Sequence, residues 1–120
     1  MYDHVGLKVN DLDASTRFYA AVLGALGYEL CARGAAYAGL GPKGEPALWL
    51  YATPTSAGAA IHVAFRAHDR EAVDRFYAAG LSQGAPDHGR PGVRADYAPT
   101  YYAAFLLDPD GNNVEAVCMR

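Results

Sequence analysis

The chain repeats part of its own sequence. When the sequence is shifted by 58 positions, segment 4–21 aligns with segment 62–79 without a gap, and nine of the eighteen residue pairs are identical, including His4 with His62. A repeat of this length indicates a fold built from two copies of one supersecondary unit. Because the copies are equivalent, the two histidines are expected at equivalent strand starts, from which they can converge on one centre.

Local patterns predict the order β-α-β-β-β twice. The helices are expected to begin at Asp11 or Asp13 and at Asp69, and to end near Gly27 and Ala79. The expected strands are 2–9, 28–33, 36–40, 47–52, 60–67, 101–107 and 113–119, with one weak strand within 82–99. The turn sequence Asp108–Gly111 predicts a hairpin of the last two strands. We therefore expect a single α+β domain over 1–120, with module one at 1–53, a linker at 54–58 and module two at 59–120.

Composition limits the classes of partner. A net charge of -3 gives no reason to expect binding to nucleic acid, and the apolar stretches are broken before they could span a membrane. Two cysteines, Cys31 and Cys118, make neither a disulfide framework nor a zinc motif. This cysteine usage favours a protein of the reducing cytoplasm.

Alternation divides each leading strand into two faces. One face is aliphatic and is expected to pack under a helix, whereas the other carries a histidine, then a small residue, then a basic residue. The second kind of face consists of His4, Gly6 and Lys8 in the first copy and of His62, Ala64 and Arg66 in the second. This pattern suits a concave pocket, with imidazole at its floor and the basic side chains toward its mouth.

Glu115 is the candidate third ligand of a metal centre. Alignment of 47–50 with 113–116 places Trp49 opposite Glu115, which stands in an otherwise apolar strand where a carboxylate is rarely buried without a partner. A lone histidine on a strand is more often an ordinary polar residue. Repeat symmetry and Glu115 nevertheless favour His4, His62 and Glu115 as a two-histidine, one-carboxylate site for a divalent transition metal, with Fe, Mn, Ni, Co and Zn left open.

Aromatic residues are expected to border this cavity. Tyr97 and Tyr102, together with Glu115, are candidate catalytic residues, because a tyrosine can orient or protonate an oxyanion. Alternatively, the aromatics only line a half-buried sheet. The candidate pocket residues are Trp49, Tyr37, Phe105, Arg66 and Lys8. The stretch 85–98 is expected to be a long loop, either a lid or a surface insertion.

These residues resemble the vicinal oxygen chelate superfamily, which includes glyoxalases, extradiol dioxygenases, fosfomycin-resistance thiol transferases and bleomycin-binding proteins. The resemblance is carried by the segments Asp3–Leu7, Arg17–Tyr19, Ile61–Val63 and Asp108–Glu115. It implies two βαβββ modules in a curved mixed sheet around a cleft, with helices on the outer face. It also implies metal ligands at His4, His62 and Glu115, and often a homodimer.

Departures from the family pattern limit the implied reaction. Where glyoxalases usually have a fourth ligand this chain has Trp49, which cannot ligate a metal, and Phe105 stands where extradiol dioxygenases usually have a tyrosine. The implied function is a metal-dependent enzyme that chelates a small oxygenated substrate through two oxygens and stabilises an oxyanion. Lyase, isomerase, dioxygenase and thiol transferase reactions stay open. The alternative is a non-catalytic resistance protein that sequesters an aromatic or drug-like ligand.

A homodimer is the expected assembly. Tyr2, Tyr51 and Met119 fall on edges or ends that would otherwise expose apolar surface. Two arrangements are possible: both modules of one chain build the site, or His4 of one subunit meets His62 and Glu115 of the other.

Overall fold

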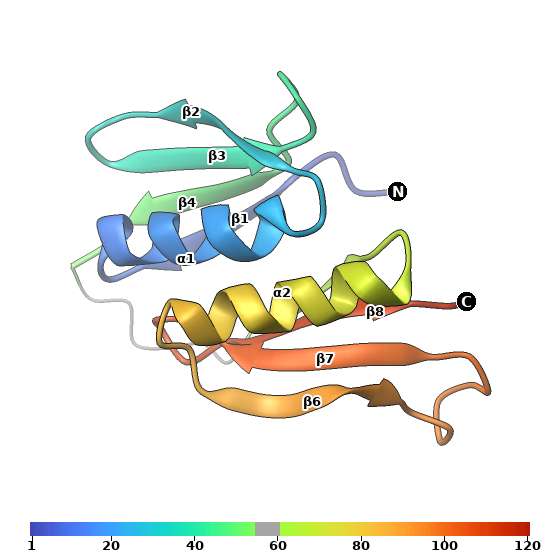
Figure 1. Cartoon of the computed structure of the whole chain (residues 1–120). Coiled ribbons are helices and arrows are strands. Elements are labelled where there is room, and N and C mark those ends of the chain that lie inside the picture. Colours follow the sequence, from blue (N-terminus) through green and yellow to red (C-terminus); the bar gives the residue numbers. More distant parts are fainter. Residues whose placement is uncertain (55–60) are drawn as a thin grey trace.

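The computed structural model describes residues 1–54 and 61–120, which form two successive β-α-β-β-β modules (Figure 1). The first contains β1 (Val5–Val9), α1 (Leu12–Gly24), β2 (Glu29–Arg33), β3 (Tyr37–Gly41) and β4 (Leu48–Ala52). The second contains β5 (His62–Arg66), α2 (Arg70–Ser82), β6 (Asp87–Val93), β7 (Tyr102–Leu107) and β8 (Asn113–Cys118). The predicted α+β repeat is therefore confirmed. Most of the expected linker, 54–58, lies outside the described residues.

Each module forms its own four-stranded mixed sheet. The strand orders are β1-β4-β3-β2 and β5-β8-β7-β6, and in both the leading strand runs parallel to the last strand of its module. The same order in both modules explains why the two sequence copies keep the same face pattern. No helix within the described residues is long and apolar enough to cross a membrane.

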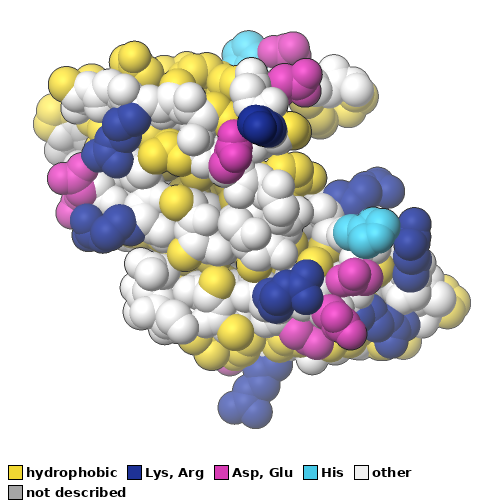
Figure 2. All heavy atoms as spheres, turned by 45° about the horizontal axis from the view of Figure 1, so that its top comes forward, with side chains coloured by type: hydrophobic (Ala, Val, Ile, Leu, Met, Phe, Trp, Pro, Cys, Tyr) yellow, Lys and Arg dark blue, Asp and Glu magenta, His cyan; other side chains and the backbone are white. Residues whose placement is uncertain are grey.

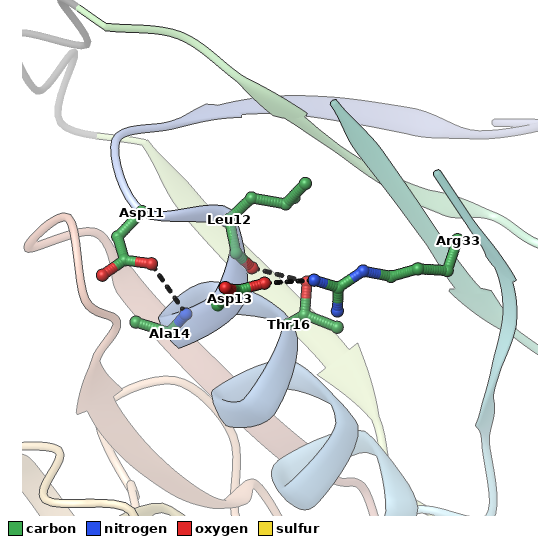
Figure 3. A network of polar contacts seen from close by, with 6 residues as sticks. All are labelled: Asp11, Leu12, Asp13, Ala14, Thr16 and Arg33. Carbon is green, nitrogen blue, oxygen red and sulfur yellow. Dashed lines mark hydrogen bonds and ion pairs between the residues drawn. The ribbon is translucent and has the colours of Figure 1, made fainter. Parts of the chain in front are cut away.

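Helix α1 begins where the sequence predicts, because an aspartate satisfies a free backbone N–H group. Oδ1 of Asp11 accepts a hydrogen bond from the N–H of Ala14 at 3.0 Å (Figure 3). Asp69 caps α2 in the same way. In the first turn of α1, Asp13 forms an ion pair with Arg33 of β2, which ties the helix to its sheet. An N-cap of this kind typically stabilises a helix by about 1 kcal/mol.

The two helices lie side by side and share one apolar core with the sheets (Figure 1). Gly80 permits the close approach of α2 to β7, because a Cβ there would lie 2.2 Å from Leu106, and it also lies near α1, since that Cβ would be 3.3 Å from Val22. The largest fully buried side chains come from both modules and include Leu7, Val9, Tyr19, Leu40, Leu50, Val73, Phe76, Leu106 and Val114. The modules therefore pack as one unit.

The predicted hairpin turn also fastens the second module to the first. Oδ1 of Asp108 accepts hydrogen bonds from the N–H groups of Asp110 and Asn112, which closes the turn between β7 and β8. Gly111 provides the positive φ of 83° that the turn requires. The hydroxyl of Tyr19, on α1, donates to Oδ2 of Asp108 at 2.5 Å. The turn is thus a contact between modules as well as a connection between strands.

The weak strand expected within 82–99 is present, and it occupies part of the stretch 85–98 that was expected to be a long loop. Residues Asp87–Val93 form β6, an edge strand that pairs with β7 with shifts of register between Asp87 and Gly89 and between Gly89 and Gly92. An edge strand tolerates Pro91, because its missing N–H can lie on the unpaired side. The glycines and the proline that suggested a loop are therefore accommodated by irregular pairing.

Candidate functional site

The second sheet gathers the candidate residues on the face opposite α2. In β8, Val114, Ala116 and Cys118 are buried. Glu115 lies between them in the sequence and therefore on the other face. Its neighbours in register are Ala64 of β5 and Phe105 of β7, so His62, two residues before Ala64, shares that face. In the first module Gly6 pairs with Trp49 as Ala64 pairs with Glu115, so Trp49 and Glu115 occupy equivalent positions.

Glu115 is a buried carboxylate with two side-chain partners. Its residue is only 3% exposed. Oε2 lies 3.0 Å from Nε2 of His62, and Oε1 accepts a hydrogen bond from the hydroxyl of Tyr101. Because an unpaired buried carboxylate would be costly, the hydrogen bond from Tyr101 offsets part of the cost of burying Glu115 in an apolar strand.

The ring of His62 is held in a defined orientation. Its Nδ1 lies 3.0 Å from the carbonyl oxygen of Asn113, which can only accept a hydrogen bond, so Nδ1 carries the proton. The ring stacks on Phe105 with a centroid distance of 6.4 Å and an interplanar angle of 23°. In the neutral ring, Nε2 then carries the lone pair and faces Glu115. Histidines that ligate metals commonly donate their other N–H to a backbone carbonyl in this way.

Tyr101 is the tyrosine that contacts Glu115. Burial, and then the hydrogen bond to Glu115 and its negative charge, raise the pKa of Tyr101 to about 12. The phenol therefore keeps its proton at neutral pH and remains a donor to the carboxylate. Tyr97 packs edge-on against Tyr101 with a centroid distance of 5.1 Å.

Tyr102 does not lie at this site. Its hydroxyl donates to Asp74 of α2 at 2.7 Å, so it belongs to the helix-facing side of the sheet. Strand alternation alone would have indicated Tyr101 as the tyrosine on the face of Glu115, because Tyr101 precedes Phe105 by four residues and residues four apart in a strand share a face. Tyr102 was predicted as a catalytic candidate, whereas the contact to Glu115 comes from Tyr101.

His4 lies apart from the pair formed by His62 and Glu115 within one chain. It immediately precedes β1, its side chain is 55% exposed, and its Nδ1 lies 2.6 Å from Oδ1 of Asp3. Within residues 1–54 and 61–120, no three His, Cys, Asp or Glu side chains cluster closely enough to hold a metal ion. Of the three predicted metal ligands, one chain therefore brings together only His62 and Glu115.

The remaining pocket candidates fall on both sheets. Trp49 packs over Gly39, where a Cβ would lie 2.7 Å from the indole, and its ring centroid is 6.1 Å from that of Tyr37. Lys8 pairs in register with Tyr51 of β4. Lys8, Tyr37 and Trp49 therefore belong to the first sheet, whereas Phe105 and Arg66 belong to the second. Arg66 lines a separate hollow near the C-terminus. Figure 2 shows acidic and basic side chains interspersed on the visible face, without a broad area of one sign.

Comparison with known proteins identifies the family. The model of the glyoxalase/bleomycin resistance protein/dioxygenase superfamily matches residues 2–116. The chain belongs to this superfamily. The resemblance expected from the sequence motifs is therefore confirmed. No curated protein matches the chain.

Solved structures of the superfamily share the fold over nearly the whole chain. A glyoxalase/bleomycin resistance protein from Albidiferax ferrireducens T118 is 32% identical, with 98% of each chain covered and a TM-score of 0.84. A family enzyme from Burkholderia phytofirmans PsJN is 22% identical, with 96% of this chain and 95% of that chain covered and a TM-score of 0.71. A lactoylglutathione lyase from Agrobacterium tumefaciens is also 22% identical, with 95% of this chain and 90% of that chain covered and a TM-score of 0.67. At 22% identity the likeness is one of fold alone.

Superfamily membership carries general properties. Its members usually bind a divalent metal and small-molecule substrates or ligands, and they commonly form dimers. The reaction varies within the superfamily, as its name states. Family membership alone therefore does not specify the reaction of this chain, and a more specific proposal has to be based on the residues around Glu115.

Proposed function

We propose that this protein is a metal-dependent enzyme of the glyoxalase/dioxygenase type that acts on a small oxygenated substrate. The observation that carries the proposal is the buried Glu115 with Nε2 of His62 3.0 Å from its Oε2. A carboxylate and an imidazole are two of the three donors of the facial metal site found in many oxygenases. The N–H of His62 that points to the Asn113 carbonyl supports this role, because it directs the Nε2 lone pair toward the carboxylate.

Each residue then has a distinct task. His62 and Glu115 would hold the metal, and Tyr101 would keep the carboxylate in one orientation through its hydrogen bond to Oε1. A divalent metal held there would supply a Lewis acid for a substrate with two neighbouring oxygens and would stabilise negative charge on them. Phe105, beneath His62, would exclude water from one side of the centre. This chemistry fits a lyase, an isomerase, a dioxygenase or a thiol transferase.

The third ligand in this proposal is His4 of the partner subunit in a homodimer. His4 is half exposed and therefore accessible to a second chain. The first module also leaves an aromatic face uncovered around Tyr37 and Tyr51, which are 42% and 43% exposed. Burying such a face against a second copy would remove apolar surface from water while bringing His4 across the interface.

Metal content tests the proposal directly. We expect protein purified without a His-tag or chelator to bind close to one metal ion per chain. His62→Ala and Glu115→Gln should each lose most of this metal, whereas the control His68→Ala should retain it. Equal metal content in all four proteins, or no metal in any of them after supplementation, would contradict the proposal.

A metal-independent binding protein is the second candidate, and the exposed aromatic face of the first module favours it. This face contains the only tryptophan of the chain, Trp49, so a bound aromatic ligand would change its fluorescence. Titration of chelator-treated protein with aromatic compounds separates the two candidates. Saturable, tight binding in a protein that never takes up metal would support sequestration.

A further inference from the structure

A cavity beside the His62–Glu115 pair has no role in the proposal above. It has a volume of about 300 Å³ and is lined by His88, Gly89, Arg94, Tyr97, Phe105 and Asn113. Two of these residues are neighbours of His62, because Phe105 stacks on its ring and Asn113 accepts its Nδ1–H. A molecule in this cavity would therefore lie next to the candidate metal ligands.

Arg94 is the first feature that points to a ligand. Its guanidinium donates to the carbonyl oxygens of Gly92, at 2.9 Å, and Arg90, at 2.6 Å, and lies 5.4 Å from the ring centroid of Phe105. Within the described residues no carboxylate lies within ion-pair distance of it. Two of its five N–H groups are used by these bonds, so three remain to bind an anion.

Two glycines of β6 make room for this arginine. A Cβ at Gly89 would lie 3.2 Å from one guanidinium nitrogen and 2.8 Å from the ring of Phe105, and a Cβ at Gly92 would lie 3.1 Å from the other guanidinium nitrogen. Gly89 also has a φ of 154°, which other residues rarely adopt. The strand is therefore shaped so that Arg94 lies across it, with its orientation fixed before any ligand arrives. A fixed guanidinium matches the two oxygens of a carboxylate.

Asn113 provides a second, independent feature in the same cavity. Its Oδ1 is buried and has no hydrogen-bond partner among the described residues. An unpaired buried amide oxygen is costly unless a ligand donates to it. A ligand hydroxyl can do so once the side chain of Asn113 turns its Oδ1 into the cavity that the residue lines. An ammonium group is disfavoured, because the lining contains no carboxylate and includes the cation Arg94.

We propose that this cavity is the substrate subsite and that it selects a small carboxylate that also carries a hydroxyl group. The substrate carboxylate would pair with Arg94, and the hydroxyl would donate to Oδ1 of Asn113. The remainder of the molecule would then extend past Phe105 toward His62 and Glu115. This inference rests on the proposed function for its reacting centre, whereas the binding it describes requires no metal.

Binding to chelator-treated protein tests this inference separately from metal content. The probe is mandelate, a small aromatic hydroxy acid, followed by shifts of backbone amide signals in nuclear magnetic resonance titrations. Two matched compounds remove one feature each: mandelamide lacks the charge and phenylacetate lacks the hydroxyl. We expect saturable shifts around β6 and Asn113 with mandelate, and binding at least about tenfold weaker with mandelamide, the loss expected for one charge-assisted hydrogen bond.

Variants assign the contacts. Arg94→Gln should weaken mandelate binding at least about tenfold. Arg90→Gln, which removes a charge from the same strand outside the cavity lining, should leave binding unchanged. Asn113→Ala should weaken the binding of mandelate but not that of phenylacetate.

Equal binding of mandelate and mandelamide to the wild-type protein would overturn the inference even if a variant failed to fold. Loss of binding in Arg90→Gln but not in Arg94→Gln would overturn it as well. If mandelate binds as expected to a protein that never takes up metal, the proposed function fails and the subsite stands.

Discussion

At the scale of single residues, the candidate chemistry depends on how one buried carboxylate is oriented. Glu115 has its two oxygens in different contacts, one with His62 and the other with Tyr101. A hydrogen bond to a carboxylate that ligates a metal fixes its direction and influences metal affinity. The tyrosine is therefore expected to act through Glu115 rather than on the substrate.

Removal of this hydroxyl should weaken metal binding. We expect Tyr101→Phe to lower metal affinity by about 10- to 100-fold, the range found when outer contacts of a metal site are removed. Tyr102→Phe is the matched control, because its hydroxyl binds Asp74 on the other face of the sheet. Competition with a chelating dye measures both affinities. Equal losses in the two variants would contradict the assignment of Tyr101.

Trp49 is expected to form an apolar wall where a fourth ligand could stand. It occupies the position in the first module that Glu115 occupies in the second. Trp49→Glu should therefore raise metal affinity several-fold in the assembled protein, because it adds a carboxylate donor. Trp49→Leu, which removes the indole without adding a donor, should not do so. An unchanged affinity in Trp49→Glu would show that this face lies away from the metal.

At the scale of secondary-structure elements, the turn between β7 and β8 joins the modules through Tyr19 and Asp108. Burial of the phenol, and then the charge of Asp108 and the hydrogen bond to it, raise the pKa of Tyr19 well above its usual value. The folded protein therefore retains this proton at a pH at which the unfolded chain, with a tyrosine pKa of about 10, loses it. The stabilisation is complete below pH of about 10 and is lost as the pH rises through the folded-state pKa.

This contact predicts a pH-dependent stability difference. At neutral pH, Tyr19→Phe should lower the free energy of unfolding by about 2 kcal/mol, because it removes a hydrogen bond to a buried carboxylate. Above a pH of about 10 the difference should shrink, because only the wild-type protein then loses stability through this group. Urea unfolding at several pH values measures this. The control Tyr2→Phe, at an exposed position, should have the same free energy of unfolding as the wild type at each pH. A stability difference between Tyr19→Phe and the wild type that does not change with pH would argue against the linkage.

At the scale of the whole molecule, the two candidate donor sets are separated. The pair of His62 and Glu115 lies on the second sheet, whereas His4 precedes the first. Uncovered apolar side chains, among them Tyr2, Tyr51 and Met119, are available for contact with a second copy. The assembly is therefore expected to determine whether the third ligand is present.

A mixing experiment tests a site shared between subunits. We expect the wild-type protein to sediment as a dimer at micromolar concentration. His4→Ala and Glu115→Ala should each fail to bind metal alone. After unfolding and refolding together, their hybrid should regain one of the two sites, because one subunit then supplies His4 and the other supplies His62 and Glu115. No recovery in a verified hybrid would mean that the site is not shared in this way.

The sequence by itself determined the modules, their helix caps and the faces of their strands. Repeat symmetry, the caps Asp11 and Asp69 and strand alternation are local properties, and the structure follows them. Tertiary structure decided two other points. It set the bounds and the irregular register of the weak strand expected within 82–99, which pairs with β7 over Asp87–Val93. It also kept His4 away from His62, because packing of the two helices against each other, rather than repeat symmetry, sets the relative position of the modules in one chain.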